Sequence, residues 1–103
     1  MQIQHGDLTV GDVGASITAD VGETLTGLNI DFEFLKPDGS MINRDATGVS
    51  GTVATYTTVS GDIDQAGQWY AFIYNATTGF YYTKESGHAF RVRPKPGDMA
   101  RAR

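Results

Sequence analysis

The alternation of apolar and polar residues from Leu28 to Phe34 constrains the fold of this chain more than any other feature. Because successive side chains of a strand point to opposite faces, this pattern predicts a half-buried β-strand. Each buried phenylalanine contributes ~2–3 kcal/mol at about 25 cal/mol per Å² of apolar surface, so folding should depend on this strand. The side chains expected to face the core are Leu28, Ile30, Phe32 and Phe34.

A second strand is predicted from Gln68 to Tyr74, directly after a turn that ends at Gly67. The stretch is rich in aromatic and β-branched residues, which suit a pleated, half-buried surface. Both of its faces are apolar, which indicates a central strand that is covered on both sides or flanked by aromatic neighbours. One face carries Trp69, Ala71 and Ile73, and the other carries Tyr70, Phe72 and Tyr74.

The remaining signals predict about seven short strands in all and no helix. Residues 1–14 form either a short first strand or an arm that docks elsewhere, and residues 44–50 are expected to form a loop. Turns every eight to twelve residues in a chain of this size are typical of a small β-sandwich, with a small barrel as the alternative. The further predicted strands are 15–20, the return through Met41 and Ile42 after a turn at 36–40, 52–59 (with Val53, Thr55 and Thr57 on one face), 80–83 and 88–93.

Composition indicates one domain with a separate basic end. The 103 residues contain no cysteine, which excludes disulfides, cysteine-bound metals and thiol nucleophiles. Residues 1–90 carry a net charge of −8 and residues 91–103 a net charge of +4. The acidic body argues against nucleic-acid binding, and the chain has neither an apolar stretch of ~20 residues for a membrane span nor a secretory signal pattern. We therefore expect a β-domain at 1–93 and a basic tail at 94–103.

A resemblance to a known family rests on the order of several motifs along residues 8–93. The segment Asp64–Trp69 resembles the corner before strand F of immunoglobulin-like domains, with Trp69 in place of the usual tyrosine and an indole N–H available to donate. Taken in order, the motifs resemble small immunoglobulin-like domains of tailed-bacteriophage virion proteins, and are similar to the N-terminal domain of siphophage upper baseplate proteins. The residues that carry this resemblance are Leu25, Gly27, Leu28, Ile30, Phe32, Lys36, Pro37, Asp38, Gly39, Asp64, Ala66, Gly67, Trp69, Gly79 and Tyr81.

The resemblance implies an all-β, immunoglobulin-like β-sandwich with a structural or accessory role in a virion. Such a protein is made in the host cytoplasm and binds other virion proteins, namely capsid, neck or tail subunits, in multiple copies. The competing hypothesis is a free-standing carbohydrate- or cell-surface-binding module, because one fold hosts many functions.

An aromatic hairpin and the basic tail are the predicted contact surfaces. Exposed aromatic side chains at a loop tip suit a protein interface, and arginines of a tail suit acidic patches on a neighbouring subunit. Strand alternation predicts that Tyr81 is buried while Phe80 and Tyr82 are exposed, or the reverse. The interface candidates are Phe80, Tyr82, Tyr74, Arg91, Arg93, Lys95, Arg101 and Arg103.

The sequence suggests no catalytic residue and no cofactor, so we expect a protein that is not an enzyme. Asp62 and Asp64 have two interpretations: they stabilise a turn, or they bind calcium together with oxygens from Asp7, Asp12 or Asp20. His5 and His88 are the only histidines, and two isolated histidines are a weak basis for a metal site.

Overall fold

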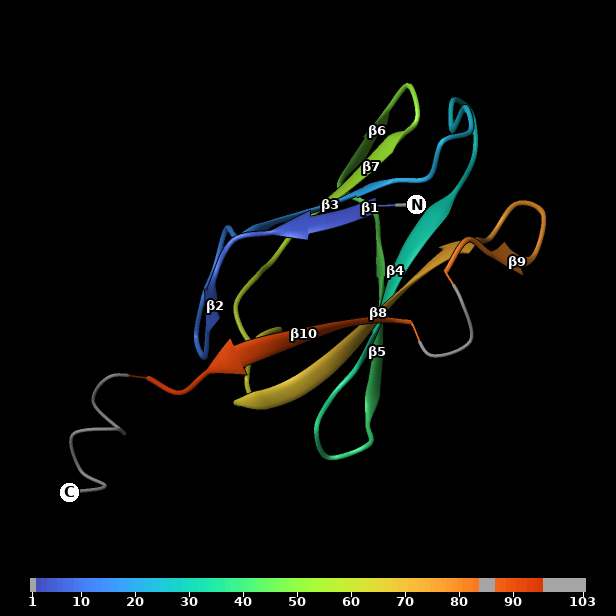
Figure 1. The fold of residues 1–103 in the computed structure, drawn as a ribbon. Coiled ribbons are helices and arrows are strands. Elements are labelled where there is room, and N and C mark those ends of the chain that lie inside the picture. The colour runs from blue at the N-terminus through green and yellow to red at the C-terminus, as the bar shows by residue number, and fades with distance from the viewer. Residues whose placement is uncertain (1, 84–86, 96–103) are drawn as a thin grey trace, which may run out of the picture.

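The computed structural model describes residues 2–83 and 87–95, and this part of the chain contains strands and no helix (Figure 1). The all-β prediction is therefore confirmed. The described residues form ten strands instead of about seven, because three additional short strands lie at sheet edges. The strands are β1 (Gln2–His5), β2 (Leu8–Thr9), β3 (Ser16–Asp20), β4 (Ile30–Leu35), β5 (Met41–Asp45), β6 (Gly48–Ser50), β7 (Val53–Thr57), β8 (Gly67–Asn75), β9 (Phe80–Tyr81) and β10 (His88–Arg93).

The strands are arranged in two sheets, consistent with a β-sandwich. The four-stranded sheet has the order β1-β3-β7-β6, and the six-stranded sheet has the order β2-β10-β8-β4-β5, with β9 paired to β8. Every pairing is antiparallel except that of β2 with β10. Of the two alternatives for residues 1–14, the first-strand one is correct, and this segment supplies one strand to each sheet.

The core lies between the two sheets and follows the predicted alternation. In β8 the side chains of Trp69, Ala71 and Ile73 are fully buried, and in β4 Phe32 is fully buried as well. The four-stranded sheet meets them with Ile17, Ala19, Ala54 and Tyr56. The predicted core residue Leu28 differs, because it precedes β4 and is only half-buried.

A side-chain hydrogen bond closes the corner before β8. The indole N–H of Trp69, which the sequence showed to be available as a donor, donates to the carbonyl oxygen of Gln65 at 3.0 Å. Gly67 has a φ of +126°, and a Cβ at this position would lie 3.1 Å from the Cγ of Pro37. Lys36 lies over the Trp69 ring, with Nζ 5.7 Å from the ring centroid. The predicted turn at 36–40 therefore packs directly against this corner.

The prediction of a loop at residues 44–50 is wrong. β5 extends through Arg44 to Asp45, and β6 begins at Gly48. Both are edge strands, and their residues are mostly exposed, so they lack the apolar alternation that identifies a half-buried strand.

The structure also refines the predicted faces of two strands. Val53, Thr55 and Thr57 do share one face of β7, but this face points away from the core, which instead receives Ala54 and Tyr56. β8 is central, as predicted, with β10 on one side and β4 on the other. Its second face is half-buried and has an aromatic neighbour in Tyr81, the second of the two predicted alternatives.

Candidate interaction surface

The outer face of the six-stranded sheet brings the largest group of functional candidates together. We call this surface the outer sheet face. Strand register places Tyr70 between Leu35 and Ala89, Phe72 opposite Glu33, and Tyr74 opposite Asp31. Its members are Asp31, Glu33 and Leu35 of β4, Met41, Asn43 and Asp45 of β5, Gln68, Tyr70, Phe72 and Tyr74 of β8, Tyr81 of β9, and Ala89, Arg91 and Arg93 of β10.

Aromatic rings form the middle of the outer sheet face. The Tyr81 ring lies 4.6 Å from that of Tyr74 and 6.3 Å from that of Phe72, measured between centroids. Tyr81 keeps 49% of its surface exposed, and Met41 on the edge strand β5 keeps 52%. The predicted interface residue Tyr74 therefore belongs to a group of neighbouring rings, which Tyr81 extends.

The two other aromatic candidates, Phe80 and Tyr82, pair with each other on the hairpin, with their ring centroids 4.8 Å apart. Phe80 is 44% exposed, whereas Tyr82 is half-buried and its hydroxyl accepts a hydrogen bond from Asn75 Nδ2 at 3.0 Å. Neither predicted alternation holds, because Phe80 and Tyr81 are both exposed. The physical reason is that β9 has only two residues and pairs only with β8, so neither of its faces is covered, and Tyr82 follows the strand instead of continuing its alternation.

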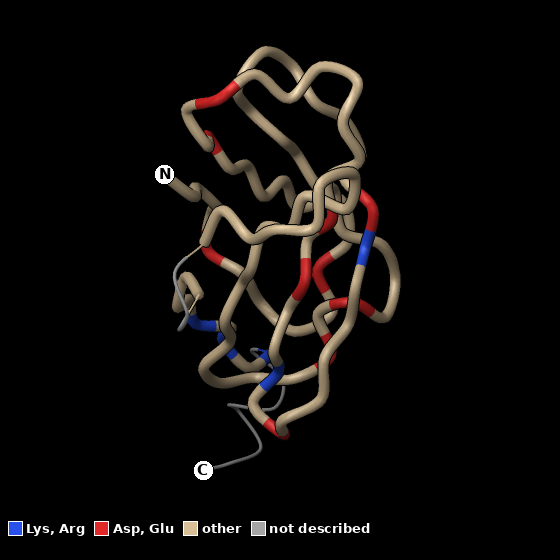
Figure 2. The backbone as a smooth tube through the Cα atoms, turned by 90° about the vertical axis from the view of Figure 1, so that its right-hand side faces the viewer, with Lys and Arg blue, Asp and Glu red and all other residues tan. Residues whose placement is uncertain are grey.

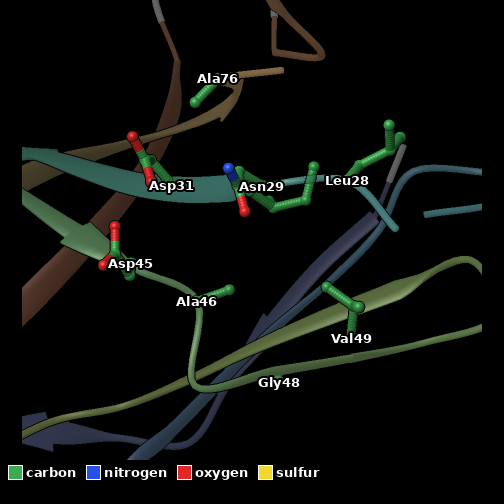
Figure 3. A pocket seen from close by; sticks show the side chains of 9 residues that line it. Leu28, Asn29, Asp31, Asp45, Ala46, Gly48, Val49 and Ala76 are labelled. Atoms are coloured by element: carbon green, nitrogen blue, oxygen red, sulfur yellow. The ribbon is translucent and has the colours of Figure 1, made fainter. Parts of the chain in front are cut away.

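One end of the outer sheet face is acidic. Asp31 and Asp45 lie directly opposite each other on β4 and β5, and Figure 3 shows both carboxylates on the same side of the strands. Burial, together with the hydrogen bond and charge of Asp45, raises the pKa of Asp31. Glu33, two residues after Asp31 on β4, accepts hydrogen bonds from Asn43 Nδ2 at 2.9 Å and from the Tyr81 hydroxyl at 2.7 Å. This last hydrogen bond raises the pKa of Tyr81.

A hollow of about 360 Å³ lies beside the acidic pair (Figure 3). It opens between the end of β5 and the start of β6, and its lining includes the apolar side chains of Leu28, Ile30, Ala46 and Val49. Apart from Asp31 and Asp45, its wall has no titratable side chain. The hollow therefore lacks the convergent acid, base and nucleophile of a catalytic pocket.

The opposite end of the outer sheet face is basic. Arg91 pairs with Gln68 in the register of β10 and β8, and Arg93 follows on the same side of the strand. Arg93 lies 3.7 Å from Asp7, and because both side chains are largely exposed, this ion pair contributes little. Figure 2 shows several lysine and arginine positions gathered toward the C-terminal end of the tube, with another on the opposite side of the molecule. Lys95 is exposed in the same region, whereas Arg101 and Arg103 lie outside the described residues.

The structure separates the two carboxylates of the predicted calcium alternative. Asp62 is 1% exposed and accepts hydrogen bonds from the Tyr56 hydroxyl, from Arg44 Nε at 3.1 Å and from the Val59 N–H at 3.0 Å. Asp64 instead binds Lys36 Nζ at 2.9 Å. Within residues 2–83 and 87–95, no three histidine, aspartate or glutamate side chains are placed to hold a metal ion. The turn interpretation fits Asp62, which accepts from the nearby Val59 N–H, whereas Asp64 forms a side-chain ion pair with Lys36 instead.

Sequence reasoning missed the network of Arg44, Tyr56 and Asp62. Tyr56 was assigned to no face, and Arg44 was placed in a loop. The hydrogen bonds to Asp62 span 18 residues for Arg44 and six for Tyr56. No local pattern reports such a contact, because it depends on how β5 and β7 are packed.

The two histidines lie together between the sheets. The rings of His5 on β1 and His88 on β10 are edge-to-face with centroids 5.7 Å apart, and His5 also lies 5.2 Å from Phe90. Burial, followed by the nearby charge of His5, lowers the pKa of His88. This pair joins one strand from each sheet, so its evident role is packing.

Comparison of the sequence with models of protein families finds no match, and comparison with curated proteins finds no similar sequence. Among the residues that the structure describes, no helix has the length and apolar character needed to cross a membrane. The site geometry and the resemblance described above are therefore the basis for a function.

Proposed function

We propose that this chain is an immunoglobulin-like sandwich that serves as a non-enzymatic structural or accessory protein of a tailed-phage virion. It binds capsid, neck or tail subunits in multiple copies of a symmetric assembly, as a head decoration, neck component or tail and baseplate component.

The strand order supports the immunoglobulin-like part of this proposal. Immunoglobulin sandwiches place strands A, B, E and D in one sheet and C, F and G in the other, with C′ added beside C in the variable type. The order β1-β3-β7-β6 parallels the first set, and the order β10-β8-β4-β5 parallels the second. The corner at Trp69 lies between β7 and β8, the strands that parallel E and F, and this is where the sequence resemblance is most detailed.

The single observation that carries a protein-binding role is the aromatic outer sheet face. Its centre holds the half-buried rings of β8 beside the exposed ring of Tyr81, and charged side chains flank this centre at both ends. Protein interfaces are typically built in this way, with aromatic residues at the centre and polar residues at the rim. Single exposed apolar residues are common on any surface, but a continuous group on one sheet face indicates a contact site.

The alternative function is a carbohydrate- or cell-surface-binding module, and the exposed rings of Phe80 and Tyr81 favour it. A sugar ring stacks on an aromatic face, and polar side chains beside the ring then bind its hydroxyl groups. The hairpin offers such an arrangement, because Tyr81 donates a hydrogen bond to Glu33 close by.

Particle composition tests the proposal. Density-purified particles of the phage that encodes the chain are analysed by quantitative mass spectrometry, and its copy number is compared with that of the major capsid protein. Hundreds of copies indicate a head decoration or tail-tube protein, and a few dozen or fewer indicate the neck or baseplate. Absence from particles, combined with saturable binding on a glycan array, overturns the proposal in favour of the alternative.

A matched pair of variants links the result to the surface. Tyr81→Ala changes the outer sheet face, while Thr55→Ala changes the exposed face of the other sheet. The proposal expects lower incorporation of Tyr81→Ala into particles and normal incorporation of Thr55→Ala. Equal incorporation of the two variants would show that the outer sheet face is not the surface that binds other virion proteins.

A further inference from the structure

We propose that the outer sheet face binds a second copy of this chain, in a two-fold dimer that places the acidic end of each copy over Arg91 and Arg93 of the other. This inference goes beyond the proposed function, which requires partners but does not identify them as further copies bound through this face.

The placement of charge on the face is the first argument. The acidic residues Asp31, Glu33 and Asp45 lie on β4 and β5, toward the start of β4. Arg91 lies two strands from β4, and its partner Gln68 is six residues along β8 from Tyr74, the partner of Asp31, and four from Phe72, the partner of Glu33. With strands ~4.8 Å apart and ~3.3 Å per residue, Arg91 is about 22 Å from Asp31 and about 16 Å from Glu33, so both acids are outside its Debye screening length in physiological salt.

In residues 2–83 and 87–95, the acidic end also has no cation of its own. Among the described residues, the groups that act on Asp31 are Asp45, Glu33 and the neutral Asn43. Like charges directly opposite each other in a sheet are destabilising, and a positive partner would remove this cost. Lys36 and Arg44 do not supply it, because they bind Asp64 and Asp62.

Self-complementarity follows from this arrangement. A two-fold axis that lies in the plane of the face, perpendicular to the line from the acidic end to the arginines, exchanges the two ends. Both charged contacts then form at once, as an isologous interface requires. Tyr70 lies midway between Arg91 and Glu33, because along β8 it is two residues from the partner of each. The two copies of Tyr70 therefore meet near the axis.

The apolar centre and the size of the face set the expected affinity. Between the charged ends lie Leu35, Met41, Tyr70 and Phe72, which would be removed from water in the dimer. Four strands ~4.8 Å apart and ~25 Å of strand length give a footprint of roughly 500 Å² per copy, below the ~800 Å² of a standard interface. We therefore expect a reversible dimer in the micromolar to millimolar range.

Sedimentation equilibrium of charge-reversed variants tests the inference. Arg91→Glu/Arg93→Glu should weaken self-association about tenfold or more, and so should Asp31→Lys/Asp45→Lys. An equimolar mixture of these two variants should associate again, because each copy then offers the complement of the other at both contacts. The control Asp20→Lys/Glu23→Lys reverses two charges elsewhere and should leave association unchanged.

A single introduced cysteine tests the symmetry, since the natural chain has none. Tyr70→Cys should form a disulfide-linked dimer under mild oxidation faster than Gln4→Cys, which lies on the four-stranded sheet. A head-to-tail contact would join the same charged ends but separate the two copies of residue 70, and it would produce species larger than a dimer.

Three results would overturn the inference: a monomer up to millimolar concentration, association that charge reversal does not affect, or an extended series of oligomers. Its failure is distinguishable from failure of the proposed function. If the chain is a monomer but still enters particles, only the dimer inference is wrong. If it forms the dimer but is absent from particles, only the proposed virion role is wrong.

Discussion

The hydroxyl of Tyr56 donates a hydrogen bond to the carboxylate of Asp62, and this bond ties the end of β7 to the turn that precedes β8. Asp62 is almost completely buried, and Arg44 reaches it from β5 with its own side chain 43% exposed. A carboxylate in the interior is thereby satisfied by three donors from different parts of the chain.

Removing this carboxylate should destabilise the domain. Asp62→Ala leaves the Tyr56 hydroxyl and the Val59 N–H without their acceptor, so the free energy of unfolding should fall by about 2–3 kcal/mol. Tyr56→Phe should cost less, about 1–2 kcal/mol, and Arg44→Met less than ~1 kcal/mol because its ion pair is half-exposed. Urea unfolding followed by Trp69 fluorescence measures all three. A larger loss for Arg44→Met than for Tyr56→Phe would contradict this order.

Protonation of Asp62 should lower the free energy of unfolding, whereas protonation of Asp31 should raise it. Burial raises the pKa of Asp62, but the hydrogen bonds from Tyr56, Val59 and Arg44 outweigh it and hold this pKa below its usual value. Its stabilising effect is present above about pH 4, the pKa of an unfolded aspartate, and is lost as pH falls through the folded value. Asp31 has a raised pKa, so its charge destabilises the fold at neutral pH.

Asp31→Asn should therefore stabilise the monomer at pH 7 by a few tenths of a kcal/mol, the scale of a cross-strand charge repulsion. The gain should vanish below about pH 4, where Asp31 is protonated in both states. Thermal unfolding of dilute protein at several pH values measures this. A gain that persists at low pH would point to packing instead of charge.

Gly87→Ala should destabilise the domain more than Gly22→Ala. Both glycines have similar positive φ values, +72° and +77°, which disfavour any residue with a Cβ. A Cβ on Gly87 would lie 2.9 Å from the Ala71 carbonyl oxygen and from the Phe72 ring, whereas nothing lies within 4 Å at Gly22. The difference between the two thermal midpoints isolates the crowding at Gly87. Equal midpoints would show that the loop before β10 moves away without cost.

His88 should titrate below the usual histidine pKa. Burial, then the charge of His5, lowers its pKa from 6.5, so the neutral form is favoured in the folded state. Stability should fall as pH drops below 6.5, because the unfolded chain takes up the proton first. NMR titration measures the midpoint, and His5→Gln should raise it part of the way toward 6.5. An unchanged midpoint in this variant would assign the whole shift to burial.

The two faces of β4 should respond differently to charge. Phe32 is fully buried, so Phe32→Asp should prevent folding, and the milder Phe32→Ala should cost about 3–5 kcal/mol. Glu33→Lys lies on the outer sheet face and should leave the domain folded. Circular dichroism and solubility of the two variants check this. Poor solubility of Glu33→Lys with a folded Phe32→Asp would contradict the assigned faces.

The sequence predicted the elements whose apolar side chains alternate. β4, β8 and β10 were located in this way because burying one face of each strand requires that pattern. The start of β5 was predicted, but its end and all of β6 were missed because their residues are exposed at a sheet edge, and the inward side chain of Arg44 reaches a buried carboxylate instead of the apolar core. On β7 the core accepts Ala54 because it lies opposite Ala19, a pairing that only the register reveals.

The candidate surface was only partly predictable. The aromatic hairpin and the arginines were visible as residue types, but their relation to the acidic end depends on the order β10-β8-β4-β5. The alternation of residues 28–34 shows only that Asp31 and Glu33 share the polar face of one strand. Their position beside Asp45, across the face from Arg91, is a property of the folded sheet.

The parallel pairing of β2 with β10 gives the domain a definite mechanical character. Leu8 lies beside Val92 and Thr9 beside Arg93, and the Val10 N–H donates to the Arg93 carbonyl oxygen at 3.0 Å. Tension that pulls the two ends of the chain apart drives these parallel strands past each other, so their hydrogen bonds are loaded together in shear. Strands loaded in this direction resist force much better than strands that unzip one bond at a time. The domain should therefore transmit tension along the chain before it yields.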